Sequence, residues 1–113
     1  MSLLSFLFGK RPNTHNAIKV LNAKAFKEGI SQKKVQLVDV RTPKEYKDGH
    51  IKGAKNIDFF SAKFIPEFSK LDKDKPVYLY CRSGARSKNS AKKLATIGFT
   101  EIYDLKGGYL NYK

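Results

Sequence analysis

Short apolar runs alternate along most of the chain with segments of helical periodicity. The run Val77–Cys81 is apolar at every position, which is typical of a strand in a parallel sheet covered on both faces. Further on, Ala91, Leu94 and Ala95 follow the i, i+3, i+4 spacing of one helix face. Gly98 then suits the residue just after the end of that helix. Strands that alternate with helices in this way predict an α/β fold.

The same pattern extends toward both ends of the chain. Asn22 and Thr42 are placed to cap helices, and Pro43 suits the first position of the second one. We expect an α/β fold with a central, mostly parallel sheet of about five strands, flanked by helices on both faces. Strands are predicted at 18–21, 35–40, 77–81 and 102–105, and an extended segment at 50–57. Helices are predicted at 23–30, at 43–47, at 61–71 and after the loop that ends at Ser87. A short tail is expected after Gly107 and Gly108.

The length of 113 residues fits a single domain. We assign residues 1–15 to an N-terminal arm of unknown role and residues 16–113 to the domain. The apolar run Leu3–Phe8 is far shorter than the ~20 residues of a spanning helix, so no transmembrane segment is expected. Lys10 and Arg11 follow the run, whereas a secretory signal carries its charge before it. A docking arm, a helix on a membrane surface and a start that is not native to the protein remain open.

The formal net charge of +13 comes mostly from lysines that are spread along the chain. The simplest interpretation is that these lysines form a solvated surface. A more specific one is that the positive charge attracts anionic substrates or partners. No motif indicates specific nucleic-acid binding. Cys81 is the only cysteine, which excludes an intrachain disulfide. With only His15 and His50 beside it, we expect no metal site and no cofactor. A lone thiol suits a reducing compartment, so we expect the cytoplasm.

The strongest chemical signal is the loop that follows the apolar strand. Cys81 ends that strand, and a helix begins shortly after Ser87. Ligands of open α/β sheets bind at the carboxyl ends of the strands, and a helix N-terminus presents backbone N–H groups and positive potential there. Gly84 permits unusual backbone angles, while Arg82 and Arg86 add permanent positive charge. This combination predicts a cradle for a sulfur oxyanion, a phosphate or an arsenate.

A thiol at such a position favours the thiolate, which is the nucleophilic form. An ionised Cys81 needs no neighbouring general base. The opposing interpretation is that a lone cysteine is a small buried hydrophobe. Two arginines at a strand end serve no packing purpose, so we interpret Cys81 as a reactive residue.

At this point the sequence resembles a known family. The segment Cys81–Ser87 is similar to the active-site loop of rhodanese-domain sulfurtransferases. Three further stretches resemble motifs of that family in the correct order, and the resemblance covers residues 18–113: Leu37–Arg41 with Glu45 and Tyr46, Gly49–Ile57, and Leu105–Tyr109.

The resemblance implies a sulfurtransferase that moves sulfane sulfur from a donor such as thiosulfate to cyanide, a thiol or a protein acceptor. Cys81 would be the catalytic residue and would carry the sulfur as a persulfide. Asp39 and Arg41 would support the loop, either by bonding its backbone or by bonding each other. The substrate-binding residues would be Arg82, Ser83, Gly84, Ala85, Arg86 and Ser87, through their backbone N–H groups and the two guanidinium groups.

Two alternatives remain. The protein could be a persulfide carrier in a sulfur relay whose partner is another protein. Related phosphatases and arsenate reductases use a loop one residue longer, because a tetrahedral group needs a wider cradle. The six residues from Cys81 to Arg86 therefore favour sulfur.

Overall fold

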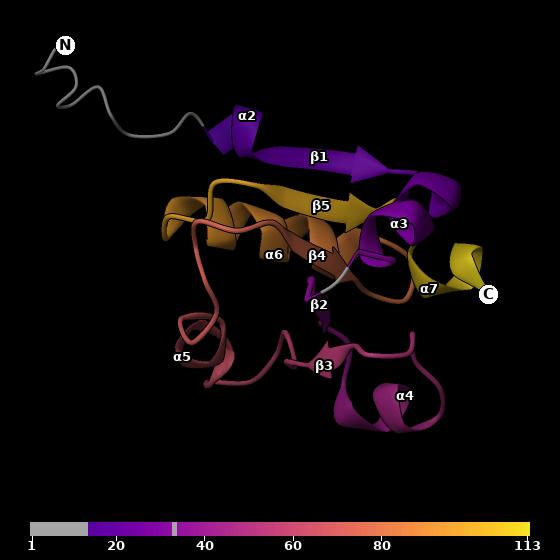
Figure 1. Ribbon diagram of the computed structural model, residues 1–113. Helices are drawn as coiled ribbons and strands as arrows, with labels where there is room; N and C mark the ends of the chain where they lie inside the picture. The colour runs from indigo at the N-terminus through magenta and orange to yellow at the C-terminus, as the bar shows by residue number, and fades with distance from the viewer. Residues whose placement is uncertain (1–13, 33) are drawn as a thin grey trace, which may run out of the picture.

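Five parallel strands form a single sheet in the order β1-β5-β4-β2-β3 (Figure 1). The computed structural model describes residues 14–32 and 34–113. The strands are β1 Ile18–Leu21, β2 Gln36–Asp39, β3 Lys55–Asn56, β4 Val77–Tyr80 and β5 Ile102–Leu105. The helices are α2 Thr14–Ala17, α3 Ala23–Ile30, α4 Pro43–Lys47, α5 Phe64–Phe68, α6 Ala85–Thr96 and α7 Gly108–Tyr112. This arrangement confirms the predicted α/β fold.

Helices cover both faces of the sheet because alternate residues of each strand point to opposite sides. On β4, Val77 and Leu79 pack into one core together with α5 and α6. Tyr78 and Tyr80 pack into a second core on the other face, where Phe26 of α3 is fully buried. All four residues of β4 are buried, as its unbroken apolar sequence predicts.

The register of the central strands places the candidate loop beside the end of β2. Asp39 lies opposite Tyr80, and the N–H of Val40 donates to the carbonyl of Tyr80 at 2.9 Å. Residues that follow β2 and β4 therefore meet at the carboxyl ends of these neighbouring strands, although about forty positions separate them in the sequence. The arrowheads of β1, β5 and β4 point toward the side where α7 lies (Figure 1).

The predicted helix caps are present. The side chain of Asn22 accepts a hydrogen bond from the N–H of Ala25 at 2.8 Å. Thr42 and Glu45 form a reciprocal capping box at the start of α4. Gly98 has a φ of 110° just after α6, as expected of the residue that ends a helix.

Two segments are less regular than the sequence predicts. Helix α5 covers only Phe64–Phe68 of the predicted 61–71. Pro66 cannot donate to the carbonyl of Ala62 and its ring would clash there, which explains why the helix begins after Ala62. The segment 50–57 was expected to be extended throughout. Instead it turns at Gly53, where φ is 89°, and only Lys55 and Asn56 pair with β2.

The predicted N-terminal arm lies largely outside the described residues, and so does the apolar run Leu3–Phe8. Helix α2 begins at Thr14, so two residues assigned to the arm belong to a helix. None of the helices within residues 14–32 and 34–113 is long and apolar enough to cross a membrane.

Candidate functional site

Cys81 lies directly after β4 with its sulfur held at the start of α6. The N–H of Gly84 donates to the Sγ atom of Cys81 at 3.0 Å. Gly84 is the N-cap of α6 and has a φ of 118°, a backbone conformation that favours glycine. The first N–H groups of a helix have no partner within the helix, and its N-terminus favours negative charge. Cys81 is only 1% exposed, so the thiol is nearly enclosed.

The C-terminal segment, for which we expected only a tail, forms α7 and binds the backbone of the candidate loop. The N–H of Tyr109 donates to the carbonyl of Cys81 at 2.8 Å, and the N–H of Leu110 donates to that of Arg82 at 3.1 Å. Gly108 makes this close approach possible. A Cβ atom on Gly108 would lie 2.5 Å from the carbonyl oxygen of Arg82 and 2.7 Å from that of Cys81.

These two hydrogen bonds orient the loop. Across a trans peptide bond, the C=O of one residue and the N–H of the next point in opposite directions. Because α7 binds the carbonyls of Cys81 and Arg82, the N–H groups of Arg82 and Ser83 point away from α7. The loop is thus held with donors directed away from the C-terminal helix.

Arg86 is paired with Glu45 of α4. Its Nη1 and Nη2 atoms donate to the two carboxylate oxygens of Glu45 at 2.8 and 3.0 Å. The hydrogen bond from Arg86 holds the pKa of Glu45 down at about 2, against the opposing effect of burial. The pKa of Arg86 is raised, first by the hydrogen bond to Glu45 and also by the charge of that carboxylate. Arg86 therefore joins α4 to α6 beside the thiol.

Asp39 and Arg41 form a second, buried pair at the end of β2. Arg41 donates through Nε and Nη2 to the carboxylate of Asp39, and the shortest contact is 2.7 Å. The same Nη2 donates to the carbonyl of Gly49 at 2.7 Å. The guanidinium also lies 4.5 Å from the ring centre of Tyr109. Asp39 and Arg41 thus bond each other, which is one of the two arrangements expected from the sequence. Through Arg41 the pair also connects β2 to the segment after α4 and to α7.

A cavity of about 210 Å³ lies next to these residues. Arg82 contributes to its wall and is exposed, in contrast to the paired Arg86. The apolar side chains of Phe60 and Leu110 are 68% and 47% exposed. The guanidinium of Arg86 lies 5.8 Å from the ring centre of Phe60. The candidate site therefore combines an exposed cation with an exposed apolar rim.

Ser83, Ala85 and Ser87 were expected to act through their backbone N–H groups, and their side chains lie in different environments. Ser83 and Ala85 are exposed. Ser87 is fully buried, and its hydroxyl donates to the carbonyl of Gly84 at 3.2 Å, so its side chain does not face a ligand at the loop. Within residues 14–32 and 34–113, no three His, Cys, Asp or Glu side chains are placed to hold a metal ion.

The sequence did not identify Arg86 as the partner of Glu45, or the approach of Gly108 to the carbonyls of the loop. The pair Gly107-Gly108 was the available signal, because adjacent glycines allow positive φ and close backbone approach. The short segment after it carries too few residues to display helical periodicity.

Comparisons with known proteins agree with this geometry. Residues 22–113 match the rhodanese-like domain family. The chain is 45% identical over 92 residues to the uncharacterized protein YqhL of Bacillus subtilis, covering 81% of this chain and 70% of that protein. It is 34% identical over 95 residues to the thiosulfate sulfurtransferase GlpE of Shewanella oneidensis, covering 83% and 91%.

A solved structure of a rhodanese-like domain protein from Staphylococcus aureus superimposes with a TM-score of 0.75 at 27% identity, covering 84% of this chain and 91% of that one. Other relatives are much longer. The chain spans 31% of the tRNA uridine(34) hydroxylase of Acinetobacter baylyi, with 38% identity over 96 residues. The match over residues 22–113, together with the fold, shows that this chain belongs to the rhodanese-like domain family.

Proposed function

We propose that this protein is a sulfurtransferase that carries sulfane sulfur as a persulfide on Cys81. The observation that carries the proposal is the hydrogen bond from the N–H of Gly84 to the sulfur of Cys81 at the N-terminus of α6. A thiolate is the form that gains most from such a donor and from the positive helix end. The similarity to thiosulfate sulfurtransferases supports the same chemistry.

The proposed reaction has two displacement steps. The Cys81 thiolate attacks the outer sulfur of thiosulfate, the S–S bond of the donor breaks, and sulfite leaves with the bonding electron pair. Cys81 then carries one additional sulfur as a persulfide anion. In the second step cyanide or a thiolate attacks that terminal sulfur, which yields thiocyanate or a new persulfide and restores the thiolate. No net oxidation is required.

The residues of the loop have distinct roles in this proposal. The N–H groups of residues 82–87 bind the negative charge on the terminal sulfur. Arg82 is exposed and attracts the donor anion, whereas the charge of Arg86 is compensated by Glu45. Because Cys81 is almost completely buried, a compact donor such as thiosulfate reaches its sulfur more readily than a bulky one. A cytoplasmic location would keep this thiol reduced.

The direct test is intact-mass spectrometry after incubation with thiosulfate. The wild type should gain the mass of one sulfur atom, and dithiothreitol should remove it. The variant Cys81→Ser, which conserves the size of the side chain, should gain nothing. An unmodified wild type, or the same addition on Cys81→Ser, would rule out the persulfide on Cys81.

A second candidate function is sulfur relay to a partner protein. The observation behind it is that Phe60 and Leu110, two exposed apolar side chains, lie at the candidate site, Phe60 near Arg86 and Leu110 at the cavity beside Arg82. Transfer rates to cyanide and to reduced thioredoxin, a protein thiol used as probe, separate the possibilities. Phe60→Ser should slow transfer to thioredoxin and leave transfer to cyanide unchanged. Equal loss with both acceptors would assign Phe60 to the small-molecule site instead.

A further inference from the structure

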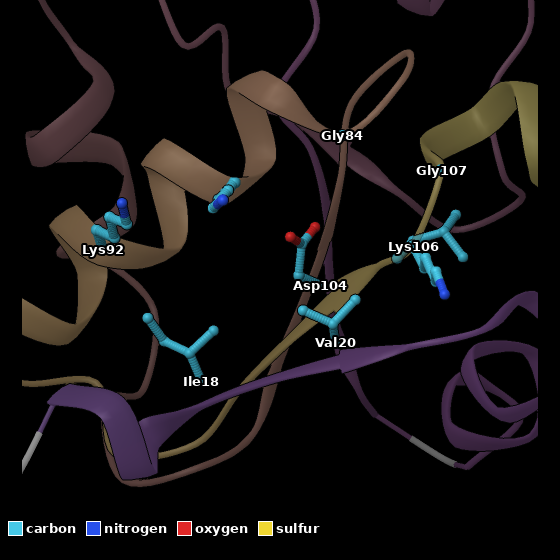
Figure 2. A pocket seen from close by; sticks show the side chains of 9 residues that line it. Ile18, Val20, Gly84, Lys92, Asp104, Lys106 and Gly107 are labelled. Carbon is cyan, nitrogen blue, oxygen red and sulfur yellow. The ribbon is translucent and has the colours of Figure 1, made fainter.

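A pocket of about 400 Å³ lies between α6, β5 and the edge strand β1. Figure 2 shows Asp104 at its centre, with Ile18 and Val20 of β1 on one side and Lys92 of α6 on the other. We call it the α6–β1 pocket. Its size lies within the range of small-molecule sites in proteins. It is lined by Ile18, Val20, Gly84, Lys88, Lys92, Asp104, Leu105, Lys106 and Gly107.

Asp104 is an unusual residue for the middle of a sheet. It is 5% exposed, and its Oδ1 atom has no hydrogen-bond partner among the described residues. Burial raises its pKa to about 6, against the effects of Ser87 and Lys88. The side chain of Ser87 reaches this carboxyl, where its hydrogen bond lowers the pKa, but Oδ1 stays without a partner among the described residues. A buried carboxyl oxygen without a donor is costly, so its presence at a pocket needs an explanation.

The α6–β1 pocket has apolar side chains on one side and lysines on other sides. Ile18 and Val20 form an apolar side, and Val20 is 58% exposed although it is a large aliphatic residue. Lysines stand around the pocket on two elements, with Lys88 and Lys92 one helical turn apart on α6 and Lys106 directly after β5. The pocket therefore presents an acceptor in its floor, an apolar wall, and several cations.

We propose that the α6–β1 pocket binds a small organic anion that has a flat apolar body and a hydrogen-bond donor. The donor binds the carboxylate of Asp104, and a rotation about χ2 is sufficient to turn either oxygen toward it. The apolar body lies against Ile18 and Val20. The anionic group binds Lys88, Lys92 and Lys106, whose flexible ammonium groups suit a phosphate. This site adjoins the loop proposed for sulfur chemistry, because Gly84 lines the pocket and also donates to Cys81, but the ligand proposed here takes no part in that chemistry.

Adenosine 5′-monophosphate is a suitable probe because it joins an amino donor, a flat base and a phosphate. Two comparison compounds test the contributions of its groups separately. Purine riboside 5′-monophosphate lacks the amino group, and inorganic phosphate lacks the base and the donor. Binding is followed by nuclear magnetic resonance, through the methyl signals of Ile18 and Val20. Adenosine 5′-monophosphate should shift these signals in a saturable way at millimolar concentration or below, and inorganic phosphate should not.

Variants of the full chain identify the groups involved. Asp104→Leu removes the acceptor at similar volume and should weaken binding of adenosine 5′-monophosphate about tenfold or more, but should change binding of purine riboside 5′-monophosphate little. Lys92→Ala should also weaken binding, whereas Lys47→Ala, which removes the same charge on α4, should not. Thermal melting of each variant checks that it folds.

Three results would overturn the proposal. The first is the absence of methyl shifts at millimolar adenosine 5′-monophosphate. The second is equal binding of the two nucleotides, which would remove Asp104 from recognition. The third is equal weakening by Lys92→Ala and Lys47→Ala, which would show attraction to net positive charge rather than a built site.

Discussion

The carboxylate of Glu45 accepts two hydrogen bonds from the guanidinium of Arg86, which lies 41 positions later in the chain. Both side chains are about three-quarters buried. The pair joins α4, which follows β2, to α6, which follows β4. It fixes the position of Arg86 beside the loop and compensates its charge, which leaves Arg82 as the exposed arginine of the loop.

Replacing Glu45 by Gln should destabilise the protein by about 1 kcal/mol at pH 7, because a charge-assisted bidentate pair at a partly exposed site is lost. The pKa of Glu45 is lowered in the folded state to about 2. Its stabilising effect is therefore complete above the ordinary glutamate pKa and disappears as the pH falls toward 2. Urea denaturation at pH 7 and pH 3 should show a smaller difference between wild type and variant at pH 3. Glu28→Gln, which removes an exposed pair with Lys24, is the matched control and should change little.

Replacing Gly108 by Ala should displace the candidate loop. The added Cβ would lie 2.5 Å from the carbonyl of Arg82, and φ is 66° at this position. Gly53→Ala isolates the backbone strain, since Gly53 has a φ of 89° with nothing within 4 Å of the new atom. We expect Gly53→Ala to cost about 1–2 kcal/mol and to leave persulfide formation unchanged. Gly108→Ala should cost more and slow persulfide formation strongly. Equal effects of the two changes on the rate would contradict the role assigned to α7.

The two arginines of the loop should differ in steady-state kinetics. Arg82→Ala should raise KM for thiosulfate about tenfold with little change in stability, because it removes an exposed cation from the approach to Cys81. Arg86→Ala should lower stability as well, since it leaves the carboxylate of Glu45 unpaired in a partly buried site. Thermal melting and thiosulfate kinetics on both variants check this division. An unchanged KM for Arg82→Ala would mean that backbone N–H groups alone bind the donor.

Asp104 should make the protein less stable as the pH rises through the acidic range. Its pKa is raised in the folded state to about 6, from an ordinary value of 3.8, chiefly by burial. The folded state therefore binds the proton more tightly than the unfolded state, and stability decreases between about pH 4 and pH 6. Asp104→Asn should remove this dependence and stabilise the protein by about 1–3 kcal/mol at pH 7, with little effect at pH 4. Denaturation curves at the two pH values measure it, and equal effects would show that Asp104 does not titrate as proposed.

The local elements follow from residues that are close together in the sequence. Asn22 and Thr42 cap their helices through groups three positions away, so their effect is visible in the sequence itself. The apolar run of β4 and the loop after it likewise predict a buried parallel strand that leads into a helix N-terminus. The position of Cys81 at the carboxyl ends of the parallel strands could be inferred for the same reason, since these ends all lie on one side of the sheet.

Only the tertiary structure decided which distant groups meet at these carboxyl ends. Glu45 has no local feature that predicts Arg86 as its partner, because the register of β2 against β4 sets their distance. Gly108 resembles an ordinary turn glycine until α7 is seen to approach the carbonyls of Cys81 and Arg82. Asp104 lies in a strand whose neighbours predict burial. Whether its carboxyl finds a partner depends on α6, which packs on β5, and on β1, which pairs with β5 in the sheet. Local rules determine caps, turns and periodicity, whereas pairing across the fold depends on how the chain closes on itself.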